Sequence, residues 1–371
     1  MSVPWPHPRR TELSWISYSS VGALRDCQLA VAFAADTRFA KARRLTQFTA
    51  LGRVVHRVIE KALSGQYEAG VADSAKDVAR RLWQECEEEA WDELQSEWAP
   101  AEPPDPHTWP FYAQRKVQTV RAISAVTETG ISSTPRKYGQ AEKFEGQPVL
   151  PWVERPLSDD ARQIRGTPDR VERRDDGVWV VDLKTGANQG KPTANQRDQL
   201  LLYAHLVSTN LGERPVGLSV ETPDGHEFSL DFAWSDVEQH VETLLGLRAS
   251  FNAAQWPLQG SPSEQACRYC AYQGLCRDFY SAREPDWTRF VPLVGRMKKV
   301  AGELPWLSVD ICIQEPQEFV DAVTHVVGVP WEVRPDVDDV VSVSSVNLVG
   351  EGALARGNWN SLTWNFHRIE A

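Results

Sequence analysis

The chain contains no apolar run of the roughly 18 residues that a transmembrane helix requires. Its first ten residues, MSVPWPHPRR, also lack the apolar stretch of a secretory signal peptide. We therefore expect a cytoplasmic protein with no membrane partner. Enough apolar residues remain for a sizeable core, because 42% of the 371 residues are hydrophobic and 9% are aromatic. A chain of this length is expected to form one large domain and a smaller one.

The chain as a whole also has no excess of basic over acidic residues. The formal net charge is -11, which argues against a protein coated in basic surface for nucleic acid. Basic residues nevertheless gather at one end, since residues 1–60 carry nine Lys and Arg against four Asp and Glu. Local basic surface is therefore available near the N-terminus, whereas the acidic segment 85–97 is typical of a solvated helix face.

Cysteine is scarce, with six residues in the chain, and a disulfide framework is not expected in a cytoplasmic protein. Three cysteines form a C-x₂-C-x₅-C pattern at Cys267, Cys270 and Cys276, and Cys27 stands alone near the N-terminus. Four thiolates are compatible with a zinc ion or with an iron–sulfur cluster. From chemistry alone zinc is the safer assignment, because structural sites with four cysteines commonly bind zinc.

Hydrophobic periodicity indicates helices in the first third of the chain and mixed elements after it. Helices are expected through Cys27, over 46–63, in the acidic region to residue 98 and over 111–129. From residue 141 the pattern changes to strands, including one over 163–174 and one over 177–186 joined by a hairpin. Helices and strands then alternate. We predict an α/β fold, with a mixed sheet flanked by helices and a helical N-terminal lobe.

The segment after residue 285 has a different pattern. Five candidate strands alternate with short turns over about 85 residues, which suits a small Greek-key barrel of the oligonucleotide-binding (OB) type. We therefore predict a larger domain over 1–285, with a helical insertion at about 64–140, and a small β-barrel over 286–371. Such a barrel can bind single strands by stacking on Trp or Phe. Its acidic stretch 336–339 favours a protein partner equally.

Two charged residues lie at the end of the apolar run Val178–Val181. Asp182 and Lys184 share one face of this strand, because successive side chains point to opposite faces. Asp169 lies 13 residues before Asp182 and can return to the same edge across the hairpin. Two carboxylates form an oxygen site for Mg²⁺ or Mn²⁺, and an adjacent lysine can act on a water or a phosphate. This chemistry suits metal-assisted hydrolysis of a phosphodiester, although a salt bridge that closes the hairpin is the alternative.

Three further polar residues occur on predicted helices. His56 lies in the middle of the helix over 46–63, where it is either a structural residue or a third metal ligand. Gln199 and Tyr203 lie four residues apart on the helix that follows the strand of Asp182. Taken alone, they are equally well explained as polar residues on a boundary face.

Together these residues resemble the PD-(D/E)xK nuclease superfamily in its RecB-like exonuclease branch. The resemblance extends over residues 14–283 and leaves the C-terminal segment outside it. Its elements, in chain order, are His56 in GRVVH, Asp169 in GTPD, Asp182 and Lys184 in DLK, and Gln199 and Tyr203 in QLLLY. It implies a restriction-endonuclease-like sheet in a nuclease domain over 1–285.

The resemblance also implies a role for each residue. The metal ligands that it implies are His56, Asp169, Asp182 and the main-chain carbonyl of Leu183. Lys184 acts on the attacking water, and Gln199 and Tyr203 orient the lysine or the DNA. In a sub-branch that includes CRISPR-associated and AddB-type nucleases, one cysteine before the core and three after it hold a [4Fe-4S] cluster. The similar distribution here implies that cluster rather than zinc, as a staple between the two ends of the domain.

The function implied is that of a Mg²⁺- or Mn²⁺-dependent deoxyribonuclease. It would be an exonuclease on single-stranded or unwound DNA, in repair, recombination or defence against foreign DNA. A helicase or a defence-complex subunit is the expected partner of the C-terminal barrel. The alternatives are a non-cutting DNA-binding adaptor and a zinc-stapled nucleic-acid-binding module. The segment Gly186–Lys191 resembles a phosphate loop, but its spacing is wrong and a proline follows, so ATP binding is not expected.

Overall fold

The computed structural model describes most of the chain. Its described residues are 3–65, 67, 73–99, 101–130, 150–184, 192–222, 225–284, 286–288, 290, 292–349 and 353–369. The segment Gly186–Lys191 and part of the expected insertion at 64–140 lie outside these ranges. Within them, no helix is long and apolar enough to cross a membrane.

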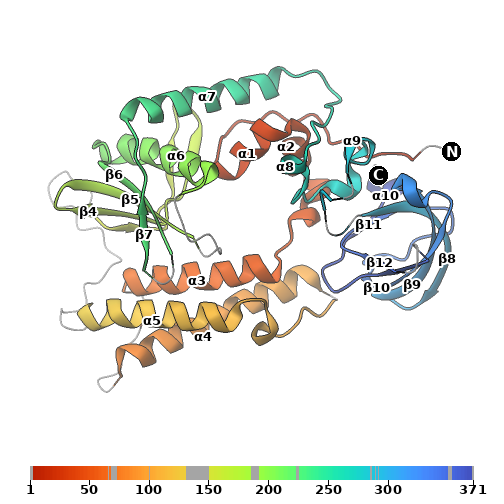
Figure 1. The fold of residues 1–371 in the computed structure, drawn as a ribbon, viewed down its shortest axis with the longest axis horizontal. Helices are drawn as coiled ribbons and strands as arrows, with labels where there is room; N and C mark the ends of the chain where they lie inside the picture. The colour runs from red at the N-terminus through yellow and green to blue at the C-terminus, as the bar shows by residue number, and fades with distance from the viewer. Residues whose placement is uncertain are drawn as a thin grey trace.

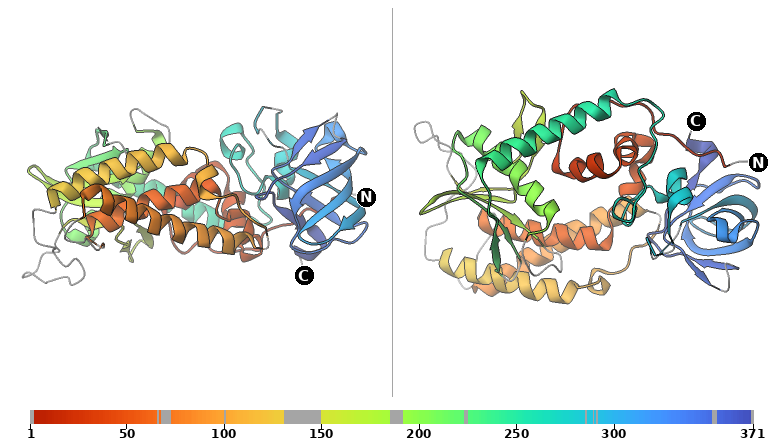
Figure 2. Two further views of the ribbon diagram at one scale, coloured as in Figure 1. Left: turned by 90° about the horizontal axis from the view of Figure 1, so that it is seen from below. Right: turned by 45° about the horizontal axis from the view of Figure 1, so that its top comes forward.

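The N-terminal region is helical, as predicted. Its elements are α1 (Tyr18–Asp26), α2 (Gln28–Ala35), the 3₁₀-helix η1 (Thr37–Arg43), α3 (Gln47–Leu63), α4 (Ala75–Trp98), the 3₁₀-helix η2 (Pro106–Thr108) and α5 (Tyr112–Gly130). Thr46 and Ser74 cap α3 and α4, because their hydroxyl oxygens accept hydrogen bonds from the amides of Thr49 and Asp77. Figures 1 and 2 show α3, α4 and α5 packed side by side as one layer.

Cys27 interrupts the helix that the sequence predicts through it. α1 ends at Asp26 and α2 begins at Gln28, and the backbone of Cys27 between them is extended, with φ -160° and ψ 100°. Its amide donates to the carbonyl of Ala23, and its carbonyl accepts from the amide of Ala30. The prediction of a single helix is wrong, because both halves have helical composition and one residue's backbone angles separate them.

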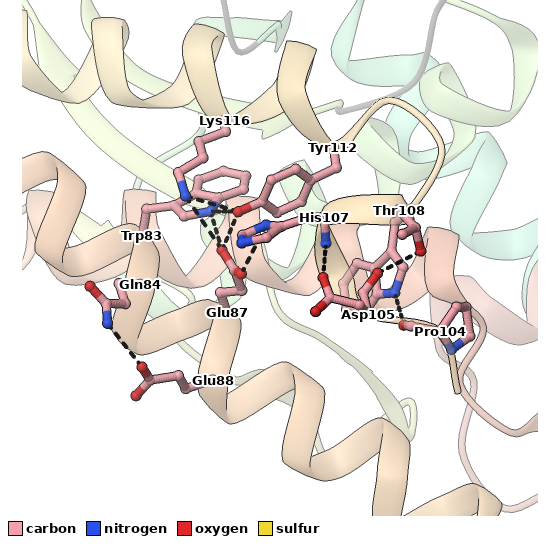
Figure 3. Close-up of polar contacts among 11 residues, drawn as sticks. Trp83, Gln84, Glu87, Glu88, Pro104, Asp105, His107, Thr108, Tyr112 and Lys116 are labelled. Carbon is pink, nitrogen blue, oxygen red and sulfur yellow. Dashed lines mark hydrogen bonds and ion pairs between the residues drawn. The ribbon is translucent and has the colours of Figure 1, made fainter. Parts of the chain in front are cut away.

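The helical layer is joined by a half-buried carboxylate. Trp83 of α4 is fully buried, yet its indole Nε1 donates to Glu87 at 2.7 Å, one turn later on the same helix. Tyr112 of α5 donates to the same carboxylate at 2.5 Å, and the ammonium of Lys116 lies 3.7 Å from it (Figure 3). Glu87 therefore ties α4 to α5 by charge-assisted hydrogen bonds.

A five-stranded mixed sheet lies beside this layer. Its strands are β1 (Trp152–Val153), β4 (Arg170–Arg174), β5 (Gly177–Leu183), β6 (Gly217–Glu221) and β7 (Glu227–Ser229), in the hydrogen-bonded order β1-β4-β5-β6-β7. β5 and β6 are parallel, and the other neighbours are antiparallel. The expected hairpin between β4 and β5 is present, with Arg174 paired to Gly177.

The segment 163–174, expected as one strand, forms two. β3 (Ile164–Gly166) pairs with β2 (Leu157–Asp159) in a separate two-stranded sheet, and β4 begins only at Arg170. Pro168 lies in the gap, where it has no N–H to donate to a ladder. The break leaves Asp169 at the start of β4 instead of inside a strand.

Two helices cover the other side of the mixed sheet. They are α6 (Ala194–Leu211) and α7 (Trp234–Ala253), and Figure 1 shows them above the sheet, with α3, α4 and α5 below it. Leu200 of α6 and Leu244 of α7 are fully buried in one core with Val178 and Val180 of β5. The expected mixed α/β fold is confirmed, and the apolar run of β5 is buried beneath α6.

A separate seven-stranded sheet forms the C-terminal region. Its elements are β8 (Leu293–Gly302), β9 (Trp306–Glu315), the 3₁₀-helix η4 (Gln317–Phe319), β10 (Val323–Pro330), β11 (Val340–Val343), β12 (Asn347–Val349), β13 (Leu354–Arg356), β14 (Thr363–Asn365) and α10 (Phe366–Ile369). The strand order is β12-β13-β10-β9-β8-β11-β14. The structure therefore shows an open sheet over the residues that it describes, and not the five-stranded closed barrel that the sequence predicts. The three-residue strands at its edges are too short to have a recognisable period-2 pattern.

Replacing Glu87 tests the junction between α4 and α5. We expect Glu87→Ala to lower the free energy of unfolding by about 1–3 kcal/mol, because Trp83 Nε1 and the Tyr112 hydroxyl lose their charged acceptor. The measurement is denaturant unfolding followed by circular dichroism. Glu88→Ala is the matched control, since Glu88 is exposed and accepts a hydrogen bond from Gln84 on its own helix. Equal effects of the two substitutions would contradict the role of Glu87.

Candidate active site

Three acidic residues lie side by side at one end of the mixed sheet. β4 pairs with β1 on one side and with β5 on the other, and the register places Glu154, Asp169 and Asp182 next to one another. The amide of Glu154 donates to the carbonyl of Asp169 at 3.0 Å, and the amide of Leu183 donates to Asp169 Oδ2 at 2.5 Å. The hairpin thus brings Asp169 and Asp182 together, as the sequence predicts.

Asp182 is completely buried at the end of β5. The Lys184 ammonium lies 2.8 Å from Asp182 Oδ2, whereas Asp182 Oδ1 has no hydrogen-bond partner within the described part of the chain. Burial raises the pKa of Asp182, and the charge of Lys184 offsets only part of this effect. A buried carboxylate with an unpartnered oxygen is costly unless a further cation compensates its charge.

A chain of hydrogen bonds fixes Lys184 from the side of α6. Lys184 Nζ donates to Gln199 Oε1 at 2.7 Å, and Gln199 Nε2 donates to the Tyr203 hydroxyl at 3.0 Å. Gln199 and Tyr203 are both buried. A Cβ on Gly166 of β3 would lie 2.8 Å from the Tyr203 ring, so the glycine makes room for Tyr203. The structure thus joins three of the predicted residues in one polar chain.

His56 approaches the carboxylates from α3. Its Nδ1 lies 3.2 Å from Glu154 Oε1 and 3.7 Å from Asp169 Oδ1. Burial by itself lowers the pKa of His56, but the hydrogen bond with Glu154 and the charge of Asp169 outweigh burial, so the pKa lies above its usual value. α3 therefore holds its histidine against the carboxylates at the end of the sheet.

One donor atom from each of His56, Glu154 and Asp169 lies within 4.8 Å of the other two. Burial, and then the nearby charge of Asp182, raises the pKa of Asp169 to about 7. Oxygen and imidazole donors gathered in this way can bind a divalent cation. Asp182 is the neighbour of Asp169 in the strand register, and its Oδ2 pairs with Lys184. Leu183 ends β5, and its side chain packs in the core of α3, α4 and α5.

Glu154 is the residue that the sequence analysis missed. It follows β1 with a positive φ of 46° and is a lone acidic residue in the segment WVERPL. Its place in the site depends on the pairing of β1 with β4, which brings residues far apart in the sequence together. The sequence does contain one indication, because Glu154 is an acidic residue next to a candidate edge strand. It does not specify the register between β1 and β4 that places Glu154 beside Asp169.

The four predicted cysteine ligands line one cavity. Cys267 ends α8 (Glu264–Cys267), while Cys270 and Cys276 flank the 3₁₀-helix η3 (Gln273–Leu275), ahead of α9 (Arg277–Ala282). Cys27 reaches the same cavity from the junction of α1 and α2. Burial raises the pKa of Cys270 to about 11 and that of Cys276 to about 12, so this apolar cavity disfavours free thiolates.

The comparisons with known proteins agree with this geometry. The model of the PD-(D/E)XK nuclease superfamily matches residues 15–277, a range that includes α1 and the cysteine segment. A comparison with curated proteins found no match. The match spans most of the chain, includes every predicted site residue and ends before the C-terminal sheet. The chain therefore belongs to the PD-(D/E)XK nuclease superfamily.

Proposed function

We propose that this protein is a Mg²⁺- or Mn²⁺-dependent deoxyribonuclease that acts as an exonuclease on single-stranded or unwound DNA. Membership of the superfamily implies a phosphodiester-cleaving hydrolase, typically dependent on a divalent metal. The observation that carries the proposal is the ion pair of Lys184 with Asp182, whose other oxygen is buried and unpartnered in the described structure, beside the donor group of His56, Glu154 and Asp169.

The donor set fits a hard divalent cation. Carboxylate oxygens are the ligands that Mg²⁺ and Mn²⁺ prefer. We assign His56, Asp169 and Asp182 as ligands, together with the Leu183 carbonyl and, added from the geometry, Glu154. A divalent ion held by these residues would supply Lewis-acid polarisation of the phosphate and would lower the pKa of the attacking water.

The remaining residues position the lysine. Lys184 Nζ donates to Gln199 Oε1, and Tyr203 accepts from the same amide, which fixes the orientation of Gln199. The ammonium is therefore held just after the end of β5. There it orients the attacking water or stabilises charge that develops on the phosphate. This arrangement supports a positioning role for Gln199 and Tyr203 and a catalytic role for Lys184.

The finer assignment rests on the order of the motifs. His56, Asp169, the pair Asp182–Lys184, and the pair Gln199–Tyr203 occur in the order of RecB-like exonucleases. We extend the proposal to that branch and to a role in repair, recombination or defence against foreign DNA. A free DNA end that passes the site suits exonucleolytic cutting. A helicase or defence-complex subunit is proposed as a partner of the C-terminal region.

We also propose that the cysteine cavity holds a [4Fe-4S] cluster rather than zinc. The four thiols come from both ends of the family region and line one cavity. One of these cysteines precedes the nuclease core and three follow it, which is the distribution that implies the cluster in the RecB-like sub-branch.

Replacing the lysine tests the catalytic assignment. We expect Lys184→Ala to slow metal-dependent cutting by about 10²- to 10⁴-fold, since it removes the group that acts on the water. The assay uses end-labelled single- and double-stranded DNA with Mn²⁺ or Mg²⁺, and EDTA as a blank. Lys299→Ala, on the exposed surface of β8, should cut like the wild type. A wild-type protein that binds DNA but never cuts it would replace this proposal with a non-cutting adaptor.

Metal binding tests the role of Glu154. We expect Glu154→Gln to weaken Mn²⁺ binding at least about tenfold in calorimetry, because one negative donor is lost while size is kept. Cutting should recover in part at high Mn²⁺ concentration. Glu213→Gln is the control, since Glu213 forms an exposed ion pair with Arg173. Unchanged Mn²⁺ affinity in Glu154→Gln would remove this residue from the ligand set.

Metal analysis of anaerobically purified protein tests the cysteine centre. We expect iron and acid-labile sulfide in the wild type and their loss in Cys270→Ser, because three thiolates do not complete the cluster. Cys312→Ser, on β9 and away from the cavity, should keep the full iron content. Stoichiometric zinc in place of iron would show that the site is a zinc staple.

A further inference from the structure

Three polar side chains form a hydrogen-bonded chain on the C-terminal sheet, outside the region that matches the nuclease superfamily. Ser308 Oγ lies 3.0 Å from His325 Nε2, and His325 Nδ1 lies 2.6 Å from Asp310 Oδ1. The imidazole is therefore held between a hydroxyl and a carboxylate, one at each ring nitrogen. Figure 1 shows β9 and β10, which carry these residues, at the opposite end of the molecule from β4 and β5. The proposed nuclease chemistry uses none of the three.

The register of two long strands places these residues on one face of the sheet. Ser308 and Asp310 are two residues apart on β9, so their side chains point to the same side. His325 on β10 pairs directly with Asp310 and is a diagonal neighbour of Ser308, within reach of an imidazole ring. Val309, between the two β9 residues, faces the opposite way into a buried core. The strands thus fix the positions of all three side chains.

A β-bulge lies beside Ser308. The register of β10 against β9 shifts at this point, so that two residues, Val327 and Gly328, lie opposite Ser308. Gly328 has a φ of 69°, in the left-handed region that favours glycine. Bulges re-aim side chains and are over-represented next to active sites. Ser308 therefore has no single residue paired with it across the strands, and its hydroxyl contacts the diagonal His325 instead.

The carboxylate sets the tautomer of the imidazole. An ionised carboxylate only accepts hydrogen bonds, so Nδ1 of His325 carries the proton and donates to Asp310. Nε2 of the neutral ring is then an acceptor, and the Ser308 hydroxyl donates to it. In this arrangement a histidine can take the proton of a serine as a general base, while the carboxylate stabilises the imidazolium that forms.

The three side chains are open to solvent. The side chain of His325 is 48% exposed and that of Asp310 is 27% exposed, while Ser308 is half-buried. An electrophile can therefore reach the hydroxyl from the outer face of the sheet. Selection by shape depends on a concave pocket, whereas an open face selects by the reactivity of the electrophile. This favours small acyl donors with a good leaving group.

We propose that Ser308 is a nucleophilic serine that accepts acyl groups from small activated esters. Its Oγ forms a bond to the carbonyl carbon of the ester, and its proton passes to His325 Nε2. The bond from that carbon to the leaving oxygen breaks, and the leaving group takes the proton from the imidazolium. Asp310 is the positioning residue that holds the base. This activity does not depend on the proposed nuclease function.

The test treats the full-length protein with p-nitrophenyl acetate, follows the release of p-nitrophenolate and locates the acetyl group by peptide mass spectrometry. The reference within the chain is Ser281, an exposed serine of α9 whose hydroxyl donates to a backbone carbonyl. We expect Ser308 to be acetylated at least about 100-fold faster than Ser281, and His325→Gln to slow it about 10²-fold or more, because the base is lost. Ser308→Ala should remove the label from this peptide.

Replacing the carboxylate tests the positioning role. An amide at residue 310 can donate to Nδ1, which moves the ring proton to Nε2, so Asp310→Asn should slow acetylation of Ser308 at least about tenfold. The matched control is Glu303→Gln, an exposed residue in the turn between β8 and β9 with the same change in charge. An unfolding midpoint close to that of the wild type in both variants separates this effect from a loss of folding.

Two results would overturn the proposal. One is acetylation of Ser308 that is no faster than that of Ser281, and the other is an equal rate in the wild type and in His325→Gln. Either result would assign the three residues to a cross-strand hydrogen-bonded clip. A rate in Asp310→Asn equal to that in Glu303→Gln would remove Asp310 from its positioning role.

Discussion

The buried carboxylate of Asp182 is the constraint on which the site depends. β5 is hydrogen-bonded on both sides, to β4 and β6, and its apolar residues are covered by α6. A negative charge at the end of such a strand has no access to water and needs compensation from the protein or from a bound cation. Lys184 supplies one positive charge, whereas Oδ1 of Asp182 has no partner among the described residues, so a further cation is favoured there.

The helices on the two sides of the sheet place different groups near Asp182. α6 contributes Gln199 and Tyr203, which fix the lysine by hydrogen bonds within a packed core. α3 contributes His56, and its packing on α4 holds the imidazole against Glu154 and Asp169. The histidine side and the lysine side of the site are therefore built on separate helical layers, on the two sides of the sheet.

The sequence predicts those parts of the fold and the candidate site that depend on local spacing. Asp182 and Lys184 share a strand face, and Gln199 and Tyr203 share a helix face, so two short patterns specify two pairs. Glu154 depends on the register between β1 and β4, which is not encoded locally. The same limit explains the break at Cys27, where one extended residue in a helical sequence turns the chain toward the cysteine cavity. It also explains the C-terminal sheet, whose short edge strands carry almost no pattern.

The boundary expected near residue 285 remains a prediction, but the packing across it bears on how the two regions work together. Phe33 of α2 and Phe279 of α9 share one buried core with Val294 of β8 and with Trp364 of β14. The cysteine cavity is lined by residues of this same core. A metal centre in that cavity would therefore stabilise the attachment of the C-terminal sheet as well as the ends of the nuclease region.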